Sequence, residues 1–142
     1  MARFFWDTNH YIYLLEGDPL FQPAVVRLRQ RMLLQKDNLI TSALTLGEIQ
    51  VKALNEGRPQ DAADLKRRVT DSSRIVPFDA ATADAFAYIR SETKIKGADA
   101  IQLACAMTAG VDFFVTNGTQ LQKLRLPGIG QITSAQNIPH TP

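Results

Sequence analysis

The sequence predicts an α/β protein with three layers, α/β/α, in which helices cover both faces of a central parallel sheet of four to five strands. Short apolar runs alternate with helical patterns along the 142 residues, as in folds where each helix returns the chain to the start of the next strand. The runs at 3–6, 74–77 and 113–115 are almost continuously apolar, which is typical of strands covered on both faces. Hydrophobic residues form 45% of the chain, enough for one buried core.

The elements follow in order along the chain. Strands are predicted at 3–6, 38–40, 74–77 and 113–115, with a short fifth at 131–132. Helices are predicted at 8–16, 23–33, 46–53, 61–69, 80–91 and 98–108. We expect a single domain over residues 1–136, followed by a loose C-terminal tail at 137–142.

Composition excludes several classes of protein. One cysteine rules out an internal disulfide, which suits a reducing cytoplasm. The first residues lack the pattern of a signal peptide, and no apolar run reaches the roughly 18 residues needed to cross a bilayer. We therefore expect a cytoplasmic protein that does not enter a membrane. The net charge of +2 and the pI of about 8.9 are compatible with a polyanionic partner.

Three carboxylates are expected at one edge of the predicted sheet. Asp7 directly follows the first strand, Glu48 lies in the first turns after the second, and Asp99 lies in the first turn of the helix at 98–108. Ligands of open parallel sheets bind beyond the carboxyl ends of the strands. Carboxylates that converge there repel one another unless a cation lies between them, and oxygen ligands suit Mg²⁺ or Mn²⁺.

Each acid also has a structural interpretation. Asp7 could cap the first helix. Thr45 and Glu48 have the spacing of a capping box, and Asp99 could complement a helix dipole. Against these stands the joint placement, since Asp99 occupies a helix with almost no other charge that is expected to be buried, where an unpaired carboxylate is costly.

Other chemistries find no support in the sequence. The chain lacks the glycine-rich phosphate loop, the dinucleotide-binding fingerprint, the nucleophile elbow and any cluster of Cys and His. Acids at strand ends also occur in phosphotransfer receiver domains. Those domains need a lysine after a later strand, however, and no lysine follows the strand at 113–115 before Lys123.

Four segments, in this order and spacing, resemble the motifs of the PIN-domain family, and most closely its VapC-type toxin ribonucleases. They are 5–9 (FWDTN), 42–48 (SALTLGE), 97–104 (GADAIQLA) and 115–117 (VTN). The resemblance extends over nearly the whole chain, and 97–104 is its most specific part.

The resemblance implies a Mg²⁺- or Mn²⁺-dependent endoribonuclease, in which a metal-activated water cleaves RNA, and it implies frequent homodimers and a small antitoxin partner. It assigns the catalytic and metal-binding roles to Asp7, Glu48 and Asp99. It assigns supporting roles, orienting carboxylates or metal-bound water, to Thr8, Asn9, Thr116 and Asn117. The apolar face of the helix at 25–33 is then a candidate docking surface for the antitoxin, unless that face packs onto the core or a dimer mate.

One position departs from the family pattern. The family commonly has a further acid after the last strand, where this chain has Gly118 behind Thr116 and Asn117. Asp112 precedes that strand and does not replace it. The departure supports an alternative function, a catalytically weak or inactive PIN-like module that binds RNA.

The remaining charged residues carry weaker predictions. Arg90, Lys94 and Lys96 precede Asp99 and are candidates for RNA phosphate contacts, although a solvated helix end explains them equally simply. His10, the only histidine near the acids, is interpreted as incidental. Arginines and lysines at 27–31 and 66–68 are interpreted as ordinary solubilising charges.

Overall fold

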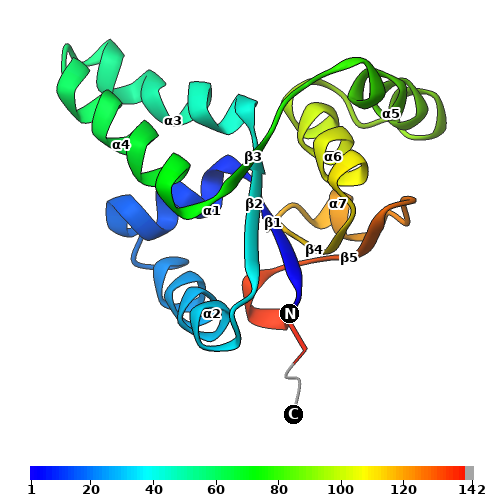
Figure 1. The fold of residues 1–142 in the computed structure, drawn as a ribbon, viewed down its shortest axis with the longest axis horizontal. Helices are drawn as coiled ribbons and strands as arrows, with labels where there is room; N and C mark the ends of the chain where they lie inside the picture. Colours follow the sequence, from blue (N-terminus) through cyan, green and yellow to red (C-terminus); the bar gives the residue numbers. More distant parts are fainter. Residues whose placement is uncertain (140–142) are drawn as a thin grey trace.

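A parallel five-stranded sheet forms the middle layer of the molecule (Figure 1), in a computed structural model that describes residues 1–139. The strand order is β3-β2-β1-β4-β5, so the first strand of the chain lies at the centre. The strands are β1 (Arg3–Trp6), β2 (Asn38–Ser42), β3 (Arg74–Val76), β4 (Val111–Val115) and β5 (Ile129–Thr133).

Helices cover both faces of this sheet, which confirms the predicted three-layer α/β/α architecture. One face carries α1 (Thr8–Ile12), the π-helical turn η1 (Tyr13–Gly17), α2 (Gln22–Gln35), α3 (Ala43–Asn55) and α4 (Pro59–Ser72). The other carries α5 (Ala80–Glu92), α6 (Gly97–Ala109) and the short α7 (Thr119–Gln122), and a 3₁₀ turn, η2 (Ala135–Asn137), follows β5. Among the described residues, no helix is long and apolar enough to span a bilayer.

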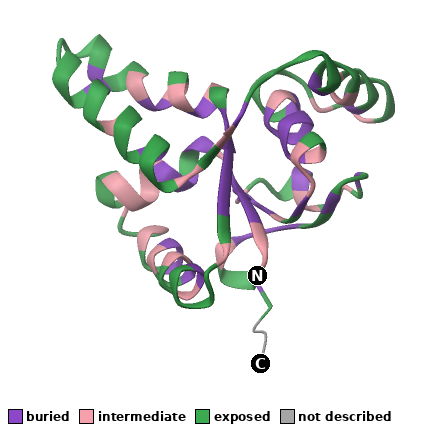
Figure 2. Cartoon of the chain, viewed as in Figure 1, coloured by how far each residue is buried: buried purple, intermediate pink, exposed green. Residues whose placement is uncertain are grey.

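The core consists of two apolar clusters, one on each face of the sheet (Figure 2). Side chains of a strand alternate between faces, so Phe5 packs toward α6 while Phe4 and Trp6 pack toward α2 and α1. All three are fully buried. Phe5 stacks on Phe114 of β4 with ring centroids 5.2 Å apart, which locks the central pair of strands in register.

The second strand is longer than predicted, and α3 begins three residues earlier than the predicted 46. Thr41 and Ser42 continue β2 because their hydroxyls hydrogen-bond inside the protein instead of ending the strand in solvent. The cap of α3 is therefore Ser42, and its side chain makes no capping hydrogen bond. The capping-box interpretation of Thr45 and Glu48 is wrong, since both lie inside the helix.

Most of the apolar face of α2 packs onto the core, which is the alternative that the sequence left open. Val25, Leu28 and Met32 are buried in the core cluster with Phe4 and Leu39. Leu33 is 61% exposed, so docking of an antitoxin at this end of the helix stays a prediction.

The core also continues past residue 136. Ile138 is buried in the same cluster. The end of the predicted tail, 140–142, lies outside the described residues.

Candidate active site

A cavity of about 360 Å³ lies at the carboxyl ends of the strands and is lined by the three predicted acids. Asp7 follows β1, Glu48 comes from α3 and Asp99 from the first turn of α6. The chain reverses its strand order between β1 and β4, and such a reversal opens a crevice beside the central strand. We call this the acid cavity; its lining residues are Asp7, Thr8, Asn9, Ile12, Glu48, Ala98, Asp99 and Gln102.

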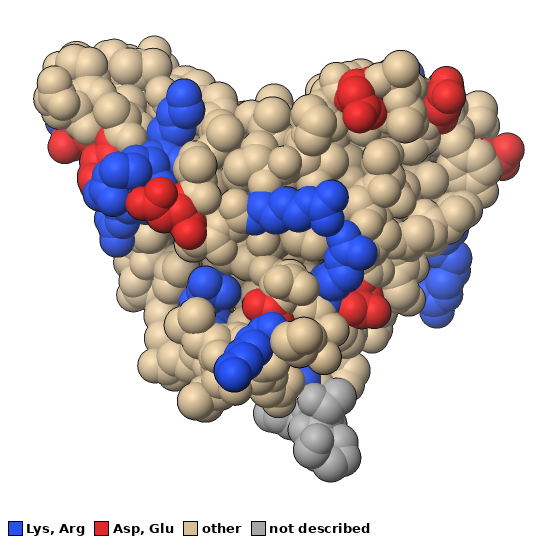
Figure 3. Space-filling model, viewed as in Figure 1, with Lys and Arg blue, Asp and Glu red and all other residues tan. Residues whose placement is uncertain are grey.

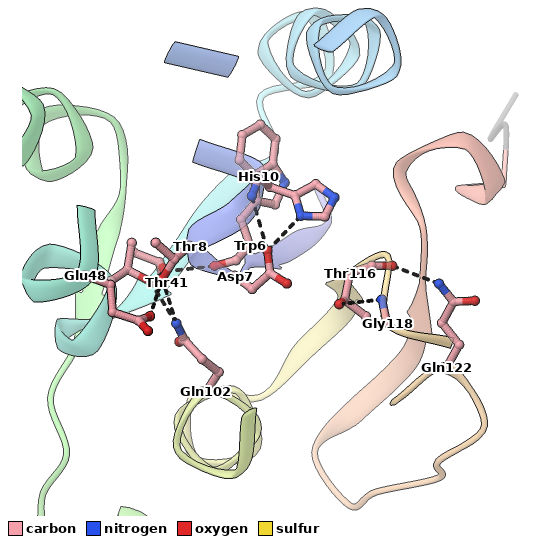
Figure 4. Close-up of polar contacts among 11 residues, drawn as sticks. Trp6, Asp7, Thr8, His10, Thr41, Glu48, Gln102, Thr116, Gly118 and Gln122 are labelled. Carbon is pink, nitrogen blue, oxygen red and sulfur yellow. Dashed lines mark hydrogen bonds and ion pairs between the residues drawn. The ribbon is translucent and has the colours of Figure 1, made fainter. Parts of the chain in front are cut away.

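Asp7 has the capping role that the sequence left open, and it also lines the acid cavity. It caps α1, because its Oδ1 accepts the backbone N–H of His10 at 3.2 Å. The same oxygen accepts from Nδ1 of His10 at 2.8 Å (Figure 4). Among the described residues, no hydrogen bond reaches the second carboxylate oxygen, so Oδ2 is available to a ligand in the acid cavity.

His10 is a contact that the sequence interpretation missed, since it was taken as incidental. Its ring is completely buried. A carboxylate only accepts hydrogen bonds, so Nδ1 carries the proton that points to Asp7. Nε2 is also buried and finds no partner in the part of the chain that is described. The ring thus contributes a single hydrogen bond, and that bond fixes the rotamer of Asp7.

Glu48 is oriented by Thr8, whose Oγ1 donates to Glu48 Oε1 at 2.6 Å. Thr8 is held in turn by the amide of Gln102, whose Nε2 donates to Oγ1 of Thr8 at 3.2 Å and of Thr45 at 2.9 Å. Ser42 donates to the amide oxygen of Gln102. This buried network joins α1, β2, α3 and α6 and places Glu48 at the cavity (Figure 4). Gln102 is a second residue that the sequence interpretation missed.

Asp99 is exposed, so the expectation of a buried carboxylate is wrong for this residue. The helix itself is buried through its opposite face, at Ala100, Leu103 and Ala104. Partial desolvation raises the pKa of Asp99, and the negative charges of Asp7 and Glu48 raise it further. The three acids therefore act on one another electrostatically across the cavity.

The donor set fits an oxygen-preferring divalent cation. Carboxylates alone line the charged part of the cavity, without thiolate or imidazole, which favours Mg²⁺ or Mn²⁺ over Zn²⁺. In the described part of the chain, no three Asp, Glu, His or Cys side chains stand close enough to hold an ion as they are. The negative charges of Asp7 and Glu48 act on Asp99 at this spacing, and a bound cation would have to draw the three carboxylates together.

The other predicted residues lie in different places. Thr8 and Asn9 line the acid cavity, whereas Thr116 and Asn117 are not among its lining residues. The buried hydroxyl of Thr116 accepts the backbone N–H of Gly118 at 3.1 Å, which shapes the loop after β4. A role of that loop at the metal stays a prediction.

Arg90, Lys94 and Lys96 are exposed and do not line the acid cavity. Lys96 is the N-cap residue of α6, three positions before Asp99. Their contacts with RNA stay a prediction.

The described residues form a three-layer parallel α/β/α domain with carboxylates at the carboxyl edge of its sheet, where open parallel sheets bind their ligands. The model of the PIN domain family matches residues 4–126, so the chain belongs to the PIN domain family. A comparison with curated protein sequences gives no match.

Several solved structures share the fold. VapBC2 from Rickettsia felis, bound to a DNA fragment from its promoter, superposes with a TM-score of 0.71 at 17% identity, over 93% of this chain and 97% of that one. DNA-bound VapBC from Salmonella typhimurium superposes with a TM-score of 0.71 at 23% identity, over 95% of this chain and 99% of that one. VapC20 from Mycobacterium tuberculosis is described as a sarcin-ricin loop cleaving toxin. It superposes with a TM-score of 0.56 at 19% identity, over 78% of this chain and 86% of that one.

Proposed function

We propose that this PIN domain is a Mg²⁺- or Mn²⁺-dependent endoribonuclease and the VapC-like toxin of a toxin–antitoxin pair. The observation that carries the proposal is the acid cavity, which is lined by three carboxylates from separate elements. Partial desolvation and the charges of Asp7 and Glu48 raise the pKa of Asp99 there. Support for the toxin role comes from the shared fold with VapBC complexes and with a toxin described as cleaving the sarcin-ricin loop.

The residues in and around the acid cavity would have different roles in such a site. Asp7, Glu48 and Asp99 would hold the cation, Thr8 keeps Glu48 turned to the cavity, and His10 keeps Asp7 in place. A bound cation supplies an activated water and stabilises negative charge at the phosphoryl group. Asn9 lines the cavity with an exposed amide that can donate to a phosphate oxygen.

Metal-dependent cleavage of RNA is the direct test. Purified protein is incubated with single-stranded and structured RNA in Mg²⁺, in Mn²⁺ or in EDTA, and products are resolved on a denaturing gel. We expect internal cuts with either metal and none in EDTA. Equal cleavage in EDTA would contradict a metal-dependent site.

A small antitoxin partner, a homodimer and a cytoplasmic location belong to the same proposal. Co-expression with the neighbouring small gene of the native host, followed by purification through a tag on this chain, should yield a complex. Light scattering on the purified chain alone then measures whether two copies associate. An isolated chain that is monomeric and finds no partner would contradict this part of the proposal.

Replacing Asp99 with Asn should stabilise the metal-free protein at neutral pH. The folded-state pKa of Asp99 is raised, so the folded protein releases this proton less readily than the unfolded chain. Above the folded pKa this residue therefore lowers the free energy of unfolding, and below the unfolded pKa it does not. Thermal unfolding in EDTA should show a higher Tm for the variant at pH 7 and equal values near pH 3. A lower Tm at pH 7 would contradict the repulsion among the acids.

Replacing His10 with Phe should weaken the metal site and leave the fold intact. Phe fills the buried ring site, and only the hydrogen bond from Nδ1 to Asp7 is lost, because Nε2 has no partner within the described chain. Loss of a residue that orients a metal ligand costs about 10–100-fold in affinity or activity. Calorimetric titration with Mn²⁺ measures the affinity directly. Tyr13 to Phe on the next turn is the control, and equal affinities for both variants would contradict the role of His10.

A catalytically weak RNA-binding module is the second candidate function, because the position of the usual further acid holds Gly118. A Cβ at this position meets Oγ1 of Thr116 at 3.4 Å and Leu121 at 3.5 Å, which are ordinary contacts, and φ is −71°. Gly118 to Asp should therefore fold and add the missing charge. We expect the Asp variant to bind Mn²⁺ more tightly and cleave several times faster, and Gly118 to Asn to match the parent. No gain in the Asp variant would show that this position lies outside the metal site.

A further inference from the structure

A larger cavity of about 660 Å³ opens at the amino ends of the strands, opposite the acid cavity. Four cationic side chains and one carboxylate line it, and we call it the basic cavity: Arg3, Arg29, Lys36, Arg74 and Asp37. Arg3 begins β1 and Arg74 begins β3, and Lys36 ends the turn that leads into β2. Parallel strands start at the same edge of a sheet, so the fold itself gathers these charges.

The cations of the basic cavity are unpaired. No side chain in the described part of the chain forms an ion pair or side-chain hydrogen bond with Arg3, Arg29, Lys36 or Arg74. Asp37 makes no ion pair with them, since its Oδ1 accepts the backbone N–H of Ala2 at 2.7 Å and its Oδ2 is buried without a partner there. Its charge offsets only one of the four cations, so the cavity keeps an excess of positive charge.

Arg29 is the most informative of the four. It is half-buried, which corrects its interpretation as a solubilising surface charge, and desolvation lowers its pKa. A partly desolvated cation without a partner is costly unless an anion binds. A guanidinium suits phosphate in particular, because its planar fork donates two parallel hydrogen bonds.

The positive charge extends beyond one cavity. Arg29 and Ser72 also line an adjoining cavity of about 330 Å³, to which Arg68 of α4 adds a further cation. Arg67 of the same cavity is paired with Asp64 and Asp71. The strands that begin at Arg3 and Arg74 are two positions apart in the sheet, roughly 10 Å. Figure 3 shows basic side chains in the middle of the face that it draws, with acidic side chains among them. A single small anion would use the basic cavity alone, whereas a chain of phosphates could also reach Arg68 in the adjoining cavity.

We propose that the basic cavity binds backbone phosphates of single-stranded RNA whose other end occupies the acid cavity. The inference rests on the proposed ribonuclease function for the identity of the polyanion. Strand β1 separates the two cavities and spans four residues, roughly 13 Å. An RNA that reaches both must therefore contain several nucleotides, and the basic cavity discriminates between long and short substrates.

The salt dependence of RNA binding tests the proposal. A fluorescent single-stranded RNA is titrated with protein in EDTA, where no cleavage occurs, over a range of salt concentrations. Each phosphate contact with a single strand contributes about 0.7 to the slope of log K against log salt. We expect Arg29→Gln with Arg74→Gln to reduce the slope by about 1.4 and weaken binding. The control, Arg27→Gln with Arg125→Gln, removes two exposed charges outside this cavity and should match the parent.

The single variant Arg74→Gln, at an exposed site, repeats the test without touching the half-buried arginine. An unchanged slope in both variants, with metal-dependent cleavage retained, would overturn this inference and leave the proposed function standing. If the variants lose binding to anionic lipid vesicles but bind RNA as the parent does, that result would also overturn the inference. A parent that neither binds nor cuts RNA would remove the proposed function itself.

Discussion

Asp7 to Asn is expected to reduce RNA cleavage by on the order of a hundredfold or more while leaving the fold intact. Loss of a residue that only orients a ligand costs about 10–100-fold, and Asp7 lines the acid cavity directly. Asn keeps the cap of α1, because its amide oxygen can still accept from the backbone and ring of His10. Single-turnover cleavage in Mn²⁺ gives the rate, and thermal unfolding in EDTA gives the stability.

Asp18 to Asn is the matched control for this prediction. Asp18 makes comparable hydrogen bonds, since its Oδ1 accepts the backbone N–H groups of Leu20 and Phe21, but it lies in the turn before α2 and away from the acid cavity. We expect its cleavage rate to equal that of the parent. Parent-like cleavage by the Asp7 variant would refute the assignment of the site.

Gln102 to Leu is expected to cause the largest loss of stability among these changes. The amide joins α6 to α1, α3 and β2, and its removal leaves the buried hydroxyl of Ser42 without its acceptor. Thr8 and Thr45 each lose one donor but keep the hydrogen bond between them, and Thr45 also keeps the bond from Thr41. Each buried polar group left unpaired costs about 1–3 kcal/mol. Cleavage should fall as well, because the orientation of Thr8 determines that of Glu48.

Urea denaturation measures the free energy of unfolding for this variant. Gln50 to Leu is the control, since the amide of Gln50 donates only to the carbonyl of Leu46 in its own helix. We expect the control to lose much less stability. Equal losses in the two variants would mean that the network contributes no more than a local helix contact.

The fold was predictable because the strands and the longer helices have recognisable local sequence patterns. Apolar runs at 3–6 and 113–115 are buried strands, and the acids that follow or flank them meet at one edge, as parallel topology requires. Membership of the PIN domain family agrees with that prediction.

The predictions that were wrong or incomplete concern contacts between residues that are distant in the sequence. Ser42 belongs to β2 because it pairs with Val76 of β3, and its hydroxyl is satisfied by Gln102, sixty residues later. The apolar face of α2 is covered by strands that no local pattern pairs with it. His10 carried a local signal that went unused, since a histidine three residues after a capping acid brings its ring within reach of that acid.

The central position of β1 has a consequence for protein synthesis. The ribosome makes this strand first, together with Asp7, but the neighbouring β4 and the third acid, Asp99, emerge only as residue 115 is approached. At about 5–20 residues per second, that interval is roughly 5–20 s. During it the nascent chain holds an incomplete set of carboxylates and an open sheet edge. The acid cavity is therefore complete only after most of the chain has been made.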